Sequence, residues 1–192
     1  GKNYLFFHAA KKNILAFLTQ EKKLVKDNEV IIVGLEKKAE KAFPVEINGK
    51  TIQAKLKGTI DRVDRVNGEL RVIDYKTGVV NANELELKDL EKIISDTNKS
   101  KAFQLMFYGL LMEDELKENE RFTSGIISFK RLNNGLLELL FAEGRGPKKA
   151  TWQPSPVERE EFKGKLQELI QQIFDTSLTF EHNEKAKYCE YC

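Results

Sequence analysis

The chain has 192 residues, of which 41% are hydrophobic and 32% are charged, and these are the proportions of one globular domain with a substantial core. This composition excludes a disordered or collagen-like chain, and the apolar runs are far shorter than the roughly 20 residues that a membrane-spanning helix needs. The formal net charge of +2, from 32 basic and 30 acidic side chains, neither supports nor excludes a polyanionic partner.

The two ends of the chain predict its location and context. No charged and then apolar secretion signal opens the sequence, so we expect a cytoplasmic protein with no membrane partner. The chain starts at Gly1 rather than at a methionine and stops at a C-x-x-C motif. We therefore expect a single domain, residues 1–192, excised from a longer polypeptide.

The first part of the chain predicts helix, strand and then hairpins. Between Asn3 and about Lys26, apolar residues at roughly helical spacing, separated by lysines, predict an amphipathic helix or two: Phe7, Ile14, Leu15, Leu18 and Leu24. The run Val30 to Leu35 is typical of a strand. Asn-Gly pairs at 48–49 and 67–68, flanked by aliphatic residues, are the strongest short-range hairpin signal, and they predict an antiparallel meander from about Ala42 to Tyr75.

The second part of the chain predicts helices around another hairpin. The segment Asn83 to Ser95 is weakly helical, and Lys101 to Glu118 is strongly helical, with an apolar stripe of Leu105, Tyr108, Leu111, Met112 and Leu116. The third Asn-Gly pair predicts a hairpin near Ser124 to Phe141. A further helix is expected from Ser155 or Pro156 through Phe174, with Ser155 as its N-cap. The predicted fold is α/β, with a mixed central sheet of antiparallel hairpins flanked by helices.

The register of the hairpin around Asn67-Gly68 brings two carboxylates together. A two-residue loop pairs Val66 with Glu69. Each step away from the loop pairs the preceding residue of the first strand with the next residue of the second strand, so Asp61 lies opposite Asp74. Because side chains alternate between faces, both share a face with Lys76. Opposed like charges destabilise a sheet, and we therefore expect a Mg²⁺ ion between the carboxylates, which favours phosphodiester hydrolysis. The alternative is a solvated hairpin whose aspartates pair with neighbouring arginines or lysines.

Three ordered motifs give this site a family context. They are GTIDRVD at residues 58–64, VIDYKTG at 72–78 and QLMFY at 104–108. In this order and spacing they resemble the PD-(D/E)XK nuclease superfamily, and within it the RecB-like and AddB-like exonuclease domains, with a restriction-endonuclease-like core. The resemblance implies that Asp61, Asp74 and the main-chain carbonyl of Tyr75 bind the metal and that Lys76 is catalytic.

Other residues gain roles from the same resemblance. Gln104 and Tyr108 match a Q-x-x-x-Y motif beside the active site, although the pattern alone favours Tyr108 as a core residue. Glu36 resembles a glutamate that family members often carry upstream of the first motif; a salt bridge at the strand end is the alternative. RecB-like members usually carry a metal-binding histidine on an early helix, and His8 is the candidate, with a packing role as its alternative.

The C-terminal cysteines resemble half of an iron–sulfur site. Cys189 and Cys192 match part of the cysteine cluster of AddB-like nucleases, but they supply two of the usual four ligands. We expect an iron–sulfur cluster only in a longer parent chain. A reduced pair of thiols or an adventitious Zn²⁺ site is the alternative.

These observations predict a Mg²⁺- or Mn²⁺-dependent deoxyribonuclease domain. The resemblance implies an exonuclease that acts in DNA repair and recombination beside a helicase domain or subunit. Arg62, Arg65 and Lys130 are candidates for DNA contact, with ordinary surface charge as the alternative. A non-catalytic DNA-binding or scaffold module of a helicase–nuclease complex is a second hypothesis, against which the intact acidic residues and lysine argue. A small-molecule metallohydrolase ranks last, because the sequence has no nucleotide-cradling glycine loop or histidine cluster.

Overall fold

The antiparallel meander predicted from the Asn-Gly pairs is confirmed, and it is longer than expected. It consists of β1 (Val30–Ile47), β2 (Lys50–Val66) and β3 (Glu69–Lys76). Asn48 and Asn67 have φ angles of 51° and 52°, and Gly49 and Gly68 follow with 73° and 84°. A type I′ turn requires two successive residues with positive φ, which asparagine and glycine adopt at least cost.

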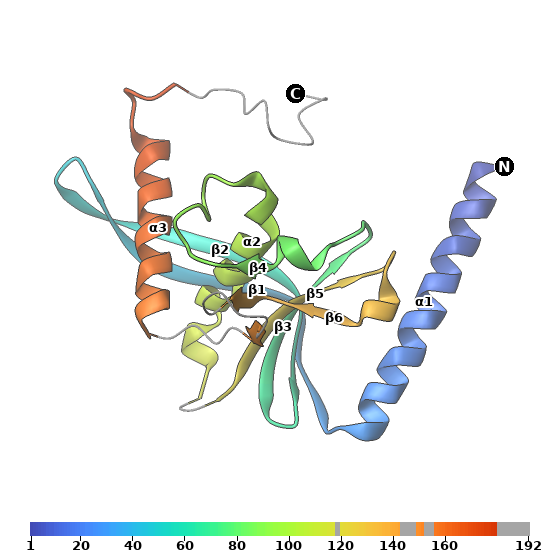
Figure 1. Cartoon of the computed structure of the whole chain (residues 1–192). Coiled ribbons are helices and arrows are strands. Elements are labelled where there is room, and N and C mark those ends of the chain that lie inside the picture. The colour runs from blue at the N-terminus through green and yellow to red at the C-terminus, as the bar shows by residue number, and fades with distance from the viewer. Residues whose placement is uncertain (118–119, 143–148, 152–155, 180–192) are drawn as a thin grey trace.

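The computed structural model describes residues 1–117, 120–142, 149–151 and 156–179. In this part of the chain the main sheet has five strands in the order β1-β2-β3-β5-β6, with β5 (Phe122–Ser128) parallel to β3 and β6 (Leu136–Glu138) antiparallel to β5. A small second sheet contains β4 (Glu86–Leu87), β7 (Leu140–Ala142) and β8 (Lys149–Thr151). This mixed sheet with flanking helices is the predicted α/β fold (Figure 1).

Three helices flank the main sheet. They are α1 (Lys2–Asp27), α2 (Ser100–Leu111) and α3 (Pro156–Phe174). The predicted helix through Phe174 is confirmed as α3, whose expected N-cap, Ser155, lies outside the described residues. The predicted helix Lys101 to Glu118 ends early, at Leu111, because the Met112 amide bonds to the carbonyls of both Tyr108 and Gly109, and a 3₁₀ turn follows.

The helix predicted weakly over Asn83 to Ser95 is wrong. This segment contains a 3₁₀ turn, the short strand β4 and further turns. The amine of Lys99 donates to the main-chain carbonyls of Asn83 and Glu86, both at 2.7 Å. Since a helix would use these carbonyls for its own hydrogen bonds, the tertiary contact overrides the weak local pattern.

The hairpin predicted near Ser124 to Phe141 is confirmed in part. Strands β5 and β6 pair from Gly125–Glu138 to Ile127–Leu136. Their connection is longer than the predicted two-residue turn, because Leu132–Asn134 form a 3₁₀ turn that ends at Gly135 with a φ of 64°. After Leu139 the chain leaves the main sheet, and β7 joins β4 in the small sheet.

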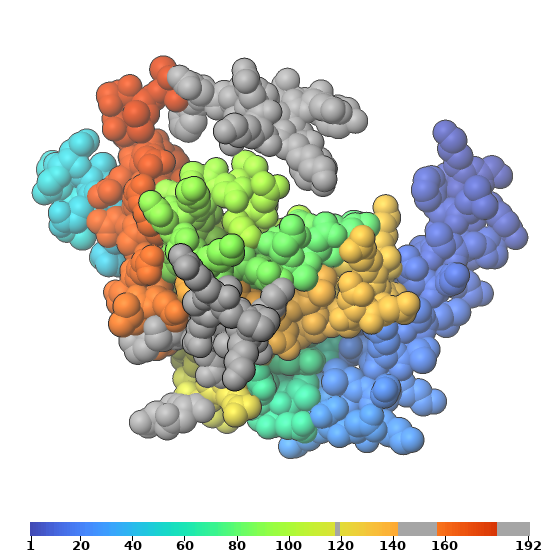
Figure 2. All heavy atoms as spheres, viewed as in Figure 1, coloured from blue at the N-terminus to red at the C-terminus, as the bar shows by residue number. Residues whose placement is uncertain are grey.

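The main core lies between the sheet and the helices α2 and α3, whose rings of Phe103 and Phe162 pack 5.6 Å apart. Helix α1 lies on the opposite face, where Phe17 packs against Tyr75. The predicted α1 helix is confirmed, but four of the five apolar residues whose spacing predicted it are exposed: Phe7, Ile14, Leu15 and Leu18. Its first eleven residues, 2–12, are exposed throughout, and Figure 2 shows this end of the helix standing clear of the rest of the described chain. No described helix has the length and apolar character to span a membrane.

Candidate active site

The predicted register of the β2–β3 hairpin places Asp61 beside Asp74. The observed pairs, from Val66–Glu69 to Arg62–Ile73, follow the calculated register. One step beyond the last pair, Asp61 Oδ2 accepts a hydrogen bond of 2.7 Å from the main-chain N–H of Tyr75. The first carboxylate is therefore held directly against the strand segment that carries the second.

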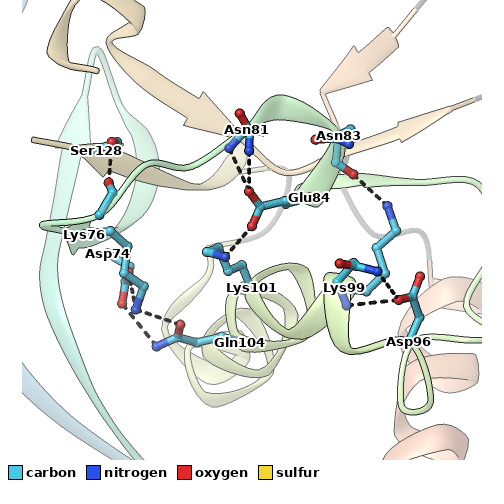
Figure 3. Close-up of polar contacts among 12 residues, drawn as sticks. Asp74, Lys76, Asn81, Asn83, Glu84, Asp96, Lys99, Lys101, Gln104 and Ser128 are labelled. Carbon is cyan, nitrogen blue, oxygen red and sulfur yellow. Dashed lines mark hydrogen bonds and ion pairs between the residues drawn. The ribbon is translucent and has the colours of Figure 1, made fainter. Parts of the chain in front are cut away.

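The second carboxylate, Asp74, is joined to Lys76 by Gln104. Asp74 is only 3% exposed. The Gln104 side chain donates from Nε2 to Asp74 Oδ1 and accepts from Lys76 Nζ, both at 3.1 Å. Lys76 Nζ also lies 2.9 Å from Asp74 Oδ2. Figure 3 shows the Gln104 amide, on α2, directed at the two strand residues.

The electrostatics of Asp74 favour a bound cation. Burial raises the pKa of this carboxyl above its usual value and the neighbouring charge of Asp61 raises it further, whereas Lys76 and Gln104 act in the opposite direction. In the described part of the chain, the buried Oδ2 atom accepts no hydrogen bond, and the Lys76 ammonium lies 2.9 Å from it as an ion pair. Lys76 balances one of the two neighbouring carboxylates, and a bound cation would offset the charge of the second.

Gln104 and Tyr108 form one unit on α2, and Gly58 allows this helix to approach the sheet. Gln104 Nε2 lies 2.8 Å from the Tyr108 hydroxyl, which accepts its hydrogen bond. Tyr108 itself is 9% exposed and belongs to the core as well as to this contact. A Cβ atom on Gly58 would lie 2.8 Å from the end of the Leu111 side chain and 3.2 Å from the Tyr108 ring, so a larger residue here would require both side chains to shift.

Comparison with known protein families identifies the superfamily of this chain. The family model described as the PD-(D/E)XK nuclease superfamily matches residues 5–192. The chain belongs to this superfamily. Its members are generally metal-dependent nucleases, and Asp61, Asp74 and Lys76 are the acidic and lysine residues that the predicted motifs place at the centre of the site.

Proteins of curated function and solved structures give no closer assignment than the superfamily. No protein of curated function matches the chain. One solved structure, described as "Crystal structure of SSO0001", matches with 16% sequence identity and a TM-score of 0.39, over 92% of this chain. The chain spans 64% of the length of that protein.

The residues present fit a divalent ion of the kind that PD-(D/E)XK nucleases typically use, Mg²⁺ or Mn²⁺. Two carboxylates, one of them with a buried oxygen that lacks a donor, and the adjacent carbonyl of Tyr75 are hard oxygen ligands. No group of three or more acidic, histidine or cysteine residues able to hold a metal ion occurs among the residues that the structure describes. Two carboxylates with water and phosphate oxygens are sufficient for Mg²⁺.

The proposed extra ligands are not brought into the site. Glu36 falls opposite Asp61, between the pairs Leu35–Arg62 and Lys37–Ile60, but it has a φ of 47° and an exposed side chain, and it forms no three-carboxylate group with Asp61 and Asp74. A positive φ is rare for glutamate and marks a strained position. 

The candidate metal ligands near the ends of the chain are His8 and the pair Cys189 and Cys192. His8 lies on the exposed end of α1, with its ring 4.2 Å from that of Tyr4. In the described part of the chain no metal-binding group of three or more residues forms around His8, and its exposed side chain is not packed into the core. Cys189 and Cys192 lie outside the described residues.

The candidates for DNA contact differ in position. Arg62 is 4% exposed and forms ion pairs with Asp64 and Glu21. It is therefore buried in the protein and not at the surface, where a DNA contact was expected. Arg65 lies near the Asn67-Gly68 turn and pairs with Glu120 at 2.5 Å. Neither arginine is placed to meet a phosphate at Asp74. Lys130 is exposed on the loop after β5, whose last residue pairs with Lys76, and therefore lies at the same end of the sheet as the site.

The motifs did not predict the polar contacts that lie behind the site, on the opposite face of the sheet. Asp64 is fully buried and accepts hydrogen bonds from Arg62 and Arg71. The hairpin register would have revealed the Asp64–Arg71 pair, which obeys the same rule as Asp61 and Asp74. The contact of Glu21 with Arg62 joins residues 41 positions apart, and no local pattern announces it.

The segment after β3 is also tied down beside the site. Ser128 Oγ donates to the carbonyl of Gly78 at 2.7 Å, and Lys101 pairs with Glu84 (Figure 3). Arg131 donates to the side chain of Asn81 at 3.1 Å. These contacts fix the path of the chain from Lys76 toward α2, and hence the position of Gln104.

Proposed function

We propose that this chain is a Mg²⁺- or Mn²⁺-dependent exodeoxyribonuclease domain of the RecB-like and AddB-like type, which hydrolyses DNA phosphodiester bonds in repair and recombination. The observation that carries the proposal is the buried Asp74 carboxylate, which Gln104 bridges to Lys76 while Asp61 lies beside it. The order and spacing of the motifs that carry these residues support the proposal.

Each residue contributes a definite task to this reaction. Asp61, Asp74 and the Tyr75 carbonyl would hold the metal ion. Bound there, Mg²⁺ or Mn²⁺ would supply a Lewis acid that polarises the phosphate and lowers the pKa of a water molecule. Lys76, held by Gln104, would orient the attacking water or offset the negative charge that develops on the phosphate oxygens.

The wider assembly belongs to the same proposal. An exonuclease of this type would act beside a helicase domain or subunit, as part of a longer polypeptide in which the cysteine pair completes an iron–sulfur site. Lys130, which is exposed on the loop at the active-site end of β5, would guide the DNA backbone.

The proposal is tested by comparing linear and covalently closed circular DNA as substrates. Purified protein is incubated with Mg²⁺ or Mn²⁺ and each end-labelled linear DNA, single- or double-stranded, beside the matching circles. Degradation of linear DNA alone is the expected result. Cleavage of circles as well would replace the exonuclease with an endonuclease.

The absence of any cleavage would favour the second hypothesis, a non-catalytic DNA-binding module. That hypothesis draws on one observation, that the described residues supply only two carboxylates for the metal. A protein that binds the same DNA, measured by fluorescence anisotropy, but leaves it intact under all these conditions would establish that module instead.

A further inference from the structure

Behind the site, on the face of the sheet that α1 covers, lies a network of four charged residues, of which Arg62 and Asp64 are buried and Glu21 and Arg71 are partly buried. Arg62 donates from Nη1 to Glu21 at 2.5 Å and from Nε to Asp64 at 2.7 Å. Arg71 donates to Asp64 through two nitrogens, both at 2.8 Å. The network contains equal numbers of positive and negative charges, which is the condition under which burial of ions is tolerated.

This network supports both strand segments that carry the catalytic carboxylates. Arg62 directly follows Asp61, and its Nη1 atom lies 3.4 Å from the hydroxyl of Tyr75, which directly follows Asp74. The N–H of Tyr75 holds Asp61 on the other side of the sheet. The side chains of Arg62 and Tyr75 therefore fix, from behind, the backbone from which Asp61 and Asp74 project.

Glu21 is the one member of this network that comes from a helix. On the same face of α1, the Phe17 ring packs 5.6 Å from the Tyr75 ring, and Gln20 donates to the Leu132 carbonyl at 2.7 Å. Burial alone would lower the pKa of Arg62, but the hydrogen bonds to Glu21 and Tyr75 and the charge of Asp64 raise it above its usual value. Arg62 is thus held as a cation between the helix and the strands.

We propose that Glu21 is a positioning residue of the active site, which holds Arg62 against Tyr75 and so couples the docking of α1 to the placement of Asp61 and Asp74. Without the Glu21 carboxylate, Arg62 keeps Asp64, which it shares with Arg71, and the 3.4 Å contact with the Tyr75 hydroxyl. Arg62 is then held less firmly against Tyr75, whose ring keeps its contacts with Phe17 and Phe129. Outer contacts of this kind orient the groups that bind a metal, although they touch neither the metal nor the substrate.

The test uses Glu21→Ala and Glu21→Gln, with Asp27→Asn as the matched control because Asp27 is an exposed carboxylate on the same helix. The first readout is hydrogen exchange of the Tyr75 amide in the native protein. We expect its exchange to accelerate about tenfold in Glu21→Ala, while the β1–β2 amides of residues 41–57 and the control protein keep their wild-type rates. Glu21→Gln should lie between, since its carbonyl oxygen still accepts from Arg62.

The second readout is DNA cleavage, and only this readout rests on the proposed function. In Glu21→Ala, kcat should fall about tenfold, at the lower end of the range for outer contacts of metal sites, with KM for DNA little changed. A residue that contributes only stability would lower the unfolding temperature and leave kcat of the folded protein intact, which would overturn the proposal.

The two readouts separate the failure of this proposal from the failure of the proposed function. If the wild-type protein cuts no DNA, the proposed function fails, and Tyr75 exchange alone decides the role of Glu21. Unchanged Tyr75 exchange in folded Glu21→Ala overturns the positioning role in either case. If Glu21→Ala does not fold, Glu21→Gln is judged by the same two measurements.

Discussion

At the scale of single residues, Asp74 combines a functional advantage with a structural cost. Its carboxylate is buried, lies beside a second carboxylate and has one oxygen without a hydrogen-bond donor in the described part of the chain. In the metal-free protein this arrangement favours the protonated form, and its pKa is raised, mainly by burial. The site is therefore arranged for a cation at the expense of stability in its absence.

The first prediction concerns the pH dependence that follows from Asp74. Between the usual pKa of an aspartate and the raised value, the folded chain binds a proton that the unfolded chain does not. The contribution of Asp74 to the free energy of unfolding of the metal-free protein therefore increases as the pH falls through that window. At higher pH the charged carboxylate destabilises the folded protein. Asp74→Asn should remove this contribution and raise the unfolding temperature near neutral pH by a few degrees, at about 2–4 °C per kcal/mol.

The measurement is thermal unfolding in chelator, between about pH 4 and pH 7, of the wild-type protein and Asp74→Asn. Asp27→Asn is the control, since it removes an exposed carboxylate. A lower unfolding temperature for Asp74→Asn than for the wild type at neutral pH would contradict the account of this carboxylate.

The second prediction separates the two roles of Tyr108, core packing and support of Gln104. Tyr108→Phe removes only the hydroxyl that accepts from Gln104. Loss of one neutral hydrogen bond is worth about 0.5–1.5 kcal/mol, so we expect kcat to fall roughly two- to tenfold with little change in unfolding temperature. Tyr4→Phe, at an exposed tyrosine of α1, is the control. Wild-type kcat in Tyr108→Phe would leave Tyr108 with a core role alone.

At the scale of elements, the turns and the register of the hairpin could be predicted from sequence, because Asn-Gly loops and strict alternation leave one pairing. That pairing alone places the side chains of Asp61, Asp74 and Lys76 on one face of the hairpin. The segment Asn83 to Ser95 could not be predicted, since its path depends on Lys99 donating to two carbonyls across the loop. Elements whose conformation depends on neighbouring residues could therefore be predicted from the sequence. Elements whose conformation depends on side chains distant in the sequence could not.

The third prediction concerns the junction of β5 and β6. A Cβ atom on Gly125 would lie 2.7 Å from the main-chain oxygen of Leu137, and this backbone cannot move without disturbing the strand pairing. Gly125→Ala should therefore cost about 1–3 kcal/mol, like other overpacked sites. The control is Gly164→Ala on α3, where a Cβ meets nothing within 4 Å and alanine is the better helix former.

Thermal or denaturant unfolding of both glycine variants provides the measurement. The free energy of unfolding should fall for Gly125→Ala and stay the same or rise by up to about 1 kcal/mol for Gly164→Ala. Equal effects at the two positions would show that the close approach at Gly125 carries no energetic weight.

At the scale of the whole molecule, one sheet separates two kinds of chemistry. The α2 face carries the carboxylates, Lys76 and Gln104, whereas the α1 face carries the ion-pair network beneath Tyr75. The sequence predicted the first face, because its motifs are local and its register can be calculated. On the second face the same register gives the Asp64–Arg71 pair, but not the contact of Glu21 with Arg62, because these two residues meet only after α1 has docked on the sheet.

The most direct test of the central claim, that Asp61, Asp74 and Lys76 form a metal-dependent nuclease centre, is cleavage of labelled linear DNA in a Mg²⁺ titration. Wild type is compared with Asp74→Asn and Lys76→Met, and with Asp27→Asn and Lys88→Met as matched surface controls. We predict metal-dependent cleavage by the wild type and both controls, lost on addition of chelator, and none by the two site variants. Cleavage that persists in Asp74→Asn or Lys76→Met at the wild-type rate would place the reaction elsewhere and contradict this account.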